Sequence, residues 1–310
     1  MARAAQQGVA THARVAGPLA FPGRAVLSKL RRYPVLPGAA LALLIISGVF
    51  APWVAPRDPD EQTLRARGAP GFWDSQWYDE NPRIEQRYFL GADHVGRDVL
   101  SRMIDGARIS LLVVAVALGA GMTVGTALGL LAGFSGGIVD EVIGRVWDMW
   151  AAIPFLLIAL IIAAVIGSSI PMLMGLLAMV SWSAFVRVVR AEVMSLKQRD
   201  YISQARVAGA GPVRIMWKHL LPNVISTVVV IATLRVGGLI LAEASLSFLG
   251  VGIPNPQATW GKMVAEGREY LADAWWMSFW PGLAIFIVVM SLNFMGDWLR
   301  DRWDPRLRQL

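Results

Sequence analysis

The residues of this sequence best suited to covalent chemistry surround a serine. Residues 133–137 read GFSGG and fit the Gly-x-Ser-x-Gly pattern of serine nucleophiles, which makes Ser135 the candidate. Such a serine needs a base within hydrogen-bond reach, usually a histidine. The histidines and lysines all lie outside the long apolar stretches, at positions 12, 94 and 219 and at positions 29, 197, 218 and 262. We therefore expect Ser135 to be a turn residue between glycines, and the chain to carry no catalytic residue.

A second group of residues has the side chains of a metal site. Asp93, His94 and Asp98 place one imidazole and two carboxylates within six residues, and the chain has no cysteine for a thiolate site. Spacing alone does not fix the geometry that a metal requires. The neighbouring cations are simpler partners, because Asp98 and Arg102 are four residues apart and would form an ion pair on a helix. We expect Arg97, Asp98 and Arg102 to pair on an interfacial helix, and we expect no metal site.

The composition defines the class of protein that must position these groups. The chain has 310 residues, of which 55% are hydrophobic and only 16% charged, and its mean hydropathy is +0.51. These values are too apolar for an ordinary soluble domain and predict an all-α integral membrane protein. The net charge of +7 does not indicate nucleic-acid binding, because the arginines stand beside apolar stretches rather than among aromatic residues on one face.

A helix needs about 20 apolar residues to cross a bilayer core of about 30 Å. On this criterion we predict six transmembrane helices. They lie near residues 36–56, 108–133, 148–168, 171–190, 223–248 and 276–299.

The distribution of charge predicts the orientation of these spans. Six lysines or arginines and no acid precede residue 36, which places the N-terminus in the cytoplasm by the positive-inside rule. Residues 57–106 carry ten acids against seven bases, as an outside loop can, whereas residues 187–222 carry seven bases against two acids. An even number of spans returns the C-terminus to the cytoplasm.

This topology divides the chain into five parts. They are a cytoplasmic tail (1–35), the first span (36–56), an external loop with an interfacial helix (57–107), a core of five further spans with a polar loop at about 191–222 (108–299), and a cytoplasmic tail (300–310).

The polar segment at 200–223, DYISQARVAGAGPVRIMWKHLLPN, lies between two apolar spans. The Gly209–Gly211 break, with Pro212 after it, predicts two short helices joined by a turn, and Pro222 marks the expected end of the second helix. On that second helix Val213, Met216, Trp217 and Leu220 follow helical spacing. Such a segment is either an amphipathic linker on the membrane surface or a docking element for a cytoplasmic partner.

The residues of this segment resemble the EAA loop of ATP-binding-cassette importer permeases, which couples the permease to its ATPase. The matching positions are Tyr201, Ala205, Arg206, Gly209, His219, Leu221, Pro222 and Asn223. Ser203 and Gln204 replace the Glu-Ala pair that names the motif. The resemblance implies an ATPase-coupling site formed by Tyr201, Ser203, Gln204, Ala205, Arg206, Gly209 and Val213.

Four further segments carry the same resemblance, to the C-type permease of oligopeptide and dipeptide importers. LGADHVGRDVLSRMIDGARISL at 90–111 is similar to the LGTDxxGRDxxSRxxxGxRxSL segment of that branch, and GFSGGIVDEVIGRVWDMWAAIP at 133–154 is similar to its GYxGGxxDxxxxRxxDxxxAxP segment. LAEASLSFLGVGIPNPQATWG at 241–261 and NFMGDWLRDRWDPRLR at 293–308 also match.

This resemblance implies the type I importer permease fold, with a cytoplasmic coupling helix, in a bacterial or archaeal inner membrane. It implies a heterodimer with a homologous permease, two ATPase subunits that bind ATP and Mg²⁺, and an external substrate-binding protein. The chain itself has no G-x-x-x-x-G-K-[ST] motif, since its one Gly-Lys pair is followed by Met263. The implied substrates are dipeptides or oligopeptides, with glutathione or nickel chelates as alternatives in related branches.

Two ionisable residues fall within the fifth span. Arg235 lies near its middle, where a cation costs about 2.5–3.5 kcal/mol on insertion scales. Glu243 is eight residues away, roughly 12 Å along a helix, and is therefore a poor direct partner. Arg235 either pairs with a group of a neighbouring helix or lines the translocation pathway, and we include Arg235 and Glu243 as candidate pathway residues.

Two other classes of membrane protein also fit six spans. A rhomboid-like intramembrane protease would use Ser135, which lacks the base described above. A secondary transporter would need groups for a coupling ion within its spans, and only Arg235 and Glu243 approach that requirement.

Overall fold

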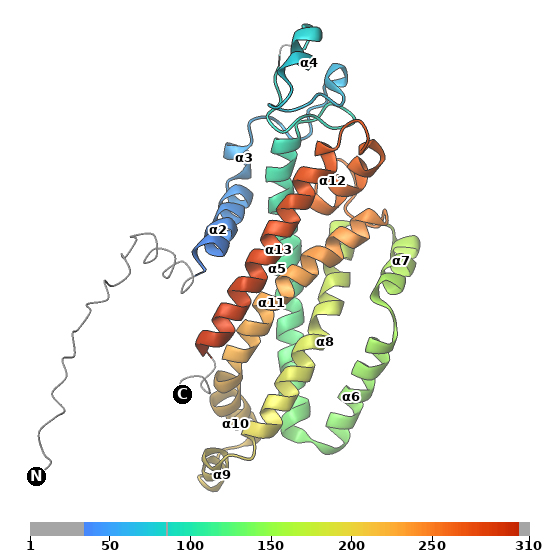
Figure 1. Ribbon diagram of the computed structural model, residues 1–310. Helices are drawn as coiled ribbons and strands as arrows, with labels where there is room; N and C mark the ends of the chain where they lie inside the picture. Colours follow the sequence, from blue (N-terminus) through green and yellow to red (C-terminus); the bar gives the residue numbers. More distant parts are fainter. Residues whose placement is uncertain (1–33, 85, 304–310) are drawn as a thin grey trace, which may run out of the picture.

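The computed structural model describes residues 34–84 and 86–303, and these residues form helices and loops without a β-sheet (Figure 1). The tails predicted at 1–35 and 300–310 lie largely outside this range. The α-helices are α2 (Val35–Val49), α3 (Ala51–Val54), α4 (Ser75–Glu80), α5 (Val99–Ser135), α6 (Gly137–Ala152), α7 (Phe155–Ile166), α8 (Ile170–Leu196), α9 (Asp200–Val207), α10 (Pro212–Ile215), α11 (Leu221–Phe248), α12 (Trp260–Gly267) and α13 (Trp276–Trp303). The predicted all-α fold is confirmed.

The long helices run side by side between two ends of the molecule (Figure 1). One end carries α4 and α12 and is called the α12 end below, and the opposite end carries α9 and α10 and is called the α9 end. Within the described residues, four helical stretches are long and apolar enough to cross a membrane: α5, α8, residues 212–248 and residues 276–302. The bent pair of α6 and α7 gives a possible fifth span, and α2 is a shorter apolar helix. The predicted count of six is therefore approximate.

The third predicted span, at 148–168, is not one helix. It is broken between α6 and α7, which are bent by 80° relative to each other. The cause is local: Pro154 disfavours the helical conformation of the residue before it, and Ile153 is extended with φ −97° and ψ 126°. The part of this span before the break belongs to a helix that begins at Gly137.

The helix predicted to end at Pro222 instead continues through it. Residues 212–248 form one helical stretch, in which Met216–Leu220 is a π-helical turn. The Leu221 N–H donates to the Met216 carbonyl, five residues back. Such a turn re-routes the backbone hydrogen bonds ahead of a proline, which has no N–H to contribute. The α9 end is therefore directly continuous with the span α11.

A row of glycines lets α5 and α8 pack closely. Gly121, Gly125, Gly129 and Gly133 recur every four residues on α5 and face α8 along its length. A Cβ added to Gly129 would lie 2.8 Å from the Val189 Cβ, and one added to Gly133 would lie 2.8 Å from the Arg190 carbonyl oxygen. Small residues at this spacing let two membrane helices approach backbone to backbone. The α5–α8 pair is therefore the rigid centre against which the other helices are placed.

Candidate functional site

The turn between α9 and α10 is a Schellman motif. Gly209 has φ +82°, its N–H donates to the Arg206 carbonyl at 2.9 Å, and the Ala210 N–H donates to the Ala205 carbonyl at 2.9 Å. This pattern closes a helix through one residue in the left-handed conformation, which favours glycine. A Cβ on Gly209 would meet nothing within 4 Å in the described chain, so the conformation rather than crowding requires a glycine there.

Three fully buried side chains hold this segment to the spans. Ile202, Ile215 and Leu220 pack into a cluster with residues of α5, α8 and α11. Ile215 was not part of the stripe expected from the sequence, and that stripe does not form one face: Leu220 is buried, whereas Val213 and Trp217 are exposed. The π-turn at Met216–Leu220 changes the helical period, which the assumed spacing of 3.6 residues did not anticipate.

The opposite side of the segment exposes apolar and basic side chains. Val207, Val213 and Trp217 are 90%, 64% and 67% exposed. Most of the residues named by the resemblance lie on this outward side: Ser203, Gln204, Arg206, Gly209 and Val213 are exposed. Ala205 is half-buried, and Tyr201 is half-buried and packs against the buried cluster. The structure thus gathers the predicted coupling residues on one end of the molecule, with apolar surface that nothing in the described chain covers.

The α12 end contains a buried cluster of four charged side chains. Asp93 Oδ2 accepts from Arg97 Nε at 2.6 Å and from Arg102 Nη1 at 2.7 Å. Glu266 Oε2, on α12, accepts from the same Arg102 Nη1 at 2.9 Å and from Arg97 Nη2 at 3.3 Å. Burial by itself raises the pKa of Asp93, but Arg102 and Arg97 outweigh it and hold that pKa below its usual value.

This cluster changes two expectations from the sequence. The predicted Asp98–Arg102 ion pair is wrong, because Asp98 caps α5 and accepts hydrogen bonds from the N–H and Oγ of Ser101, at 2.8 and 2.6 Å. Asp93, His94 and Glu266 lie close enough to hold a metal ion. Two arginines already pair with the carboxylates of Asp93 and Glu266, so these two acids are explained as members of an ion-pair network. Glu266 is the member that local spacing did not reveal.

The two candidate pathway residues of α11 have opposite surroundings. Glu243 is 1% exposed, and its Oε1 accepts from Ser247 Oγ and Thr259 Oγ1, each at 2.8 Å. It therefore ties α11 to the start of α12 and offers no surface to a pathway within this chain, contrary to our expectation. Arg235 is exposed, and within the described residues it forms no ion pair or hydrogen bond with a neighbouring helix.

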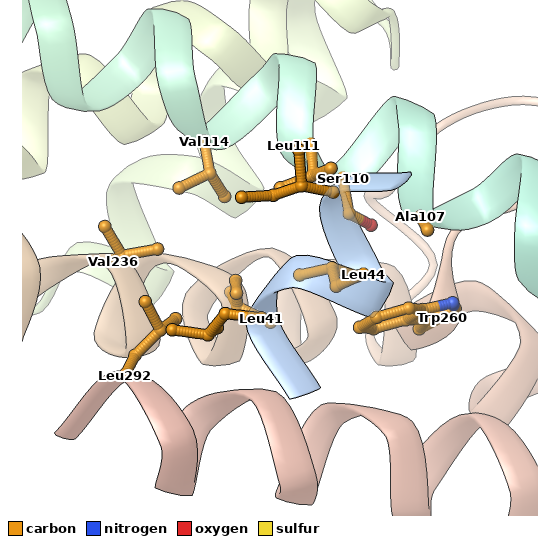
Figure 2. Close-up of a pocket in the computed structure, with 11 residues that line it drawn as sticks. Leu41, Leu44, Ala107, Ser110, Leu111, Val114, Val236, Trp260 and Leu292 are labelled. Carbon is orange, nitrogen blue, oxygen red and sulfur yellow. The ribbon is translucent and has the colours of Figure 1, made fainter. Parts of the chain in front are cut away.

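A cavity of about 110 Å³ lies among α2, α5, α11, α13 and the start of α12 (Figure 2). Its lining is apolar apart from Ser110, and Leu44, Val114 and Leu292 point into it from three different helices. A lining without charge gives no partner to the charged termini of a peptide. This cavity is therefore not a candidate for the translocation pathway.

The nucleophile candidate lies at the α9 end. Ser135 is the exposed last residue of α5. Lys197 is the nearby base, but its Nζ donates to the Phe134 carbonyl at 2.7 Å, and no hydrogen bond in the described chain joins Ser135 to a lysine or histidine. The geometry agrees with the role of a turn residue.

Comparison with known proteins gives a consistent set of similarities. Residues 125–309 match the family described as the binding-protein-dependent transport system inner membrane component. The chain is 41% identical over 268 residues to the di/tripeptide transport system permease protein DppC of Pseudomonas aeruginosa, with 86% of each chain covered. It is 37% identical over 279 residues to the glutathione transport system permease protein GsiD of Pectobacterium atrosepticum, covering 90% of this chain and 89% of the relative.

Two further similarities concern another substrate and the fold. The chain is 37% identical over 267 residues to the nickel transport system permease protein NikC of Escherichia coli, covering 86% of this chain and 92% of the relative. A solved structure of the MetNI methionine ABC transporter in an inward-facing conformation matches with a TM-score of 0.53 and 19% identity, over 63% of this chain and 92% of that chain. At that identity the structural match supports the fold alone.

Proposed function

The chain belongs to the family of binding-protein-dependent transport system inner membrane components, and we propose that it is one of the two permease subunits of an ATP-driven importer for dipeptides or short oligopeptides. It is a multi-pass inner-membrane permease subunit of an ABC transporter. The proposal of a peptide substrate rests on the relatives, of which the di/tripeptide permease has 41% identity. Glutathione and nickel permeases at 37% identity define the alternatives that a transport assay has to separate.

The observation that carries the coupling role is the exposed surface of the α9–α10 segment. It is anchored from within by Ile202, Ile215 and Leu220, so it is a fixed part of the fold. On its outer side, Val207, Val213 and Trp217 form apolar surface flanked by Arg206 and Arg214. A rigid apolar patch rimmed by charge is typical of a docking surface. We assign it to a partner ATPase.

The importer requires three kinds of partner. A homologous permease forms the other half of the pathway, two ATPase subunits bind ATP and Mg²⁺, and an external binding protein delivers the substrate. Exposed apolar side chains on α6 and α7, among them Ile138, Ile161 and Val165 at 80%, 65% and 81%, face outward and are available to the second permease and to lipid. The chain then takes no cofactor of its own and performs no hydrolysis.

The orientation follows from the charge pattern and the docking surface together. We place the α9 end, with both tails, in the cytoplasm, and the α12 end outside, with the external loop at residues 57–107, the core at 108–299 and the coupling loop at about 191–222. In α11 the exposed Arg235 is assigned to the shared pathway, where a water-filled environment removes the cost of a cation in lipid.

The test is isolation of the intact complex followed by transport. The chain should co-purify with a second permease and with an ATPase that carries a Walker A motif. Reconstituted with its binding protein, the complex should import a radiolabelled dipeptide, with nickel chelates and glutathione as competitors. Absence of an ATPase from the purified complex would refute the importer assignment, whereas uptake of glutathione or nickel alone would refute only the substrate.

A further inference from the structure

We propose that Asp140 and Arg190 are a positioning pair that fastens α6 to α8, so that the third span moves together with the coupling segment when the partner ATPase acts. This inference rests on the proposed function, and it adds a role for two residues outside the docking surface. It is carried by how α6 is attached to the rest of the chain.

Helix α6 makes few other contacts with the described part of this chain. Within the part of the chain that the structure describes, none of its residues is buried. Most of its apolar side chains are exposed, among them Ile138, Val142 and Met149 at 80%, 55% and 62%. Helix α7, beyond the bend at Pro154, buries only Ala159. A helix without a buried face takes its position from specific side-chain contacts.

Those contacts all lead to α8, at successive levels along α6. Near its start, both carboxylate oxygens of Asp140 accept from the Arg190 guanidinium, Oδ1 from Nε and Oδ2 from Nη2 at 2.7 Å. Two turns on, the Trp147 indole N–H donates to the Ser183 carbonyl at 3.1 Å, and Arg187 lies over the Trp147 ring at 4.4 Å. These positions follow one stripe of α6, so the helix is tied to α8 along one side.

The Asp140–Arg190 contact is a bidentate ion pair. A bidentate arginine–carboxylate pair fixes orientation as well as distance, because the guanidinium and the carboxylate are both planar. The Asp140 side chain is 17% exposed and that of Arg190 39%, so the pair is partly shielded from water. Asp140 also lies in the first turn of α6, where the helix dipole favours a negative charge.

The same region touches the coupling segment. The last residues of α5 lie against it: Lys197 donates to the Phe134 carbonyl at 2.7 Å, and the guanidinium of Arg206, on α9, lies 5.8 Å from the centre of the Phe134 ring. Gly136 and Gly137, with φ of +66° and +54°, join α5 to α6. A displacement of α9 is therefore transmitted to the start of α6 through α8 and Phe134. The Asp140–Arg190 ion pair makes α6 move together with α8.

The experiment compares substitutions of this pair in the intact, reconstituted transporter. Asp140→Asn keeps the size of the side chain but removes its charge, Arg190→Gln removes the partner, and Asp140→Glu keeps a bidentate acceptor. We measure peptide imported per ATP hydrolysed, together with the distance from a spin label on α6, at Val142→Cys, to one on α13, at Phe286→Cys. Both labelled positions are exposed, and the chain has no native cysteine.

The neutral variants should lower the ratio of transport to hydrolysis about fivefold or more, while hydrolysis itself continues. The ATP-dependent change in label distance should shrink with it. Asp140→Glu should retain at least half of the wild-type ratio. A merely structural role predicts loss of assembly or of hydrolysis without a selective loss of the ratio.

The matched control is the exposed ion pair next to it on the same helix. Glu141 and Arg145 are 66% and 74% exposed, and within residues 34–84 and 86–303 their one ion pair is with each other, at 3.4 Å. Glu141→Gln should leave the ratio and the label distances unchanged. An unchanged ratio in Asp140→Asn and Arg190→Gln, an equal fall in Glu141→Gln, or failure of Asp140→Asn to assemble would overturn the proposal. Failure of the wild-type chain to bind any ATPase would instead refute the proposed function.

Discussion

At the α12 end of this chain charged side chains are buried and paired with each other, whereas at the α9 end apolar side chains are exposed and covered by nothing in the described chain. Asp93 and Arg102 are 4% and 1% exposed, while Val207 and Trp217 are 90% and 67% exposed. In the first arrangement each charge of the Asp93–Arg97–Arg102–Glu266 cluster has an opposite charge beside it within the described chain, and two nitrogens of Arg102, Nε and Nη2, have no hydrogen-bond partner there. We propose that the second is completed by the partner ATPase. The two ends should therefore respond to substitution in different assays, one in stability and the other in coupling.

The strongest test of this difference between the two ends removes one charge from the α12 end. Arg102→Met leaves Asp93 and Glu266 with Arg97 as the one arginine that pairs with both of them in the described chain. Breaking a buried ion pair by removal of one partner costs about 3–5 kcal/mol, because the remaining charge stays uncompensated. We expect a large fall in the thermal unfolding temperature of the purified chain in detergent, measured by tryptophan fluorescence.

The control restores the balance of charge without restoring the arginine. In the double variant Arg102→Met with Glu266→Gln, the Asp93–Arg97 pair at 2.6 Å remains intact. This variant should recover most of the lost stability. If the double variant were as unstable as Arg102→Met, the arginine would contribute through packing, and the picture of a self-contained charged network would fail.

The complementary substitution at the α9 end is Gly209→Trp. It strains the turn by about 1–2 kcal/mol, since Gly209 has φ +82°, and it places an indole where the partner ATPase is proposed to dock. We expect the chain to insert and to assemble with the second permease, but to lose substrate-stimulated ATP hydrolysis.

Gly209→Asn separates the two effects, because asparagine tolerates the left-handed conformation and is small. It should keep most of the stimulated hydrolysis. Wild-type coupling in Gly209→Trp would show that this turn does not contact the ATPase.

These two ends also show how far the sequence alone leads. The turn at Gly209 follows from residues adjacent in the chain, and the glycine-rich break was sufficient to predict it. One of the two partners of Arg102 was not predictable, because Glu266 is 164 residues away and no local spacing connects the two. The same limit applies to Asp98, which forms a helix cap although its spacing from Arg102 suits an ion pair.

The spans show a related limit. Hydropathy located the four long spans at about the observed residues, since it depends only on composition over about 20 residues. The first predicted span, 36–56, corresponds to the shorter apolar helix α2. It did not show that Pro154 bends one stretch by 80° or that the helix continues through Pro222 by a π-turn. From the local sequence, Pro154 and Pro222 both predict the end of a helix. The packing around each proline decides whether the helix breaks or continues.

Between the two ends, Arg235 tests whether the middle of α11 faces the pathway. Arg235→Leu should assemble normally and should transport a free-carboxylate peptide about tenfold less well than its amidated form, because a lost charged contact is worth roughly 1–2 kcal/mol. Uptake of the two peptides by proteoliposomes, with the binding protein saturated, gives the ratio. An equal loss for both peptides, or a loss of assembly, would place Arg235 in a contact with a neighbouring helix instead.

The smallest expected effect concerns pH at the α12 end. Burial lowers the pKa of the Lys262 ammonium from 10.5 to about 8, with Glu266 opposing and Arg102 and Arg97 reinforcing the shift. Below pH 8 the ammonium is charged in both the folded and the unfolded chain, so the cost of burying it is fully present. Between pH 8 and 10.5 only the unfolded chain keeps the proton, and the free energy of unfolding therefore rises with pH. Solvent around this half-buried side chain limits the gain to about 1 kcal/mol.

Unfolding temperatures of wild type and Lys262→Met at about pH 7 and about pH 10 isolate this contribution, because the other titrating groups are common to both proteins. The wild type should gain stability relative to the variant at the higher pH. An equal change in the two proteins would mean that burying the charged Lys262 ammonium beside the arginines does not destabilise the folded chain.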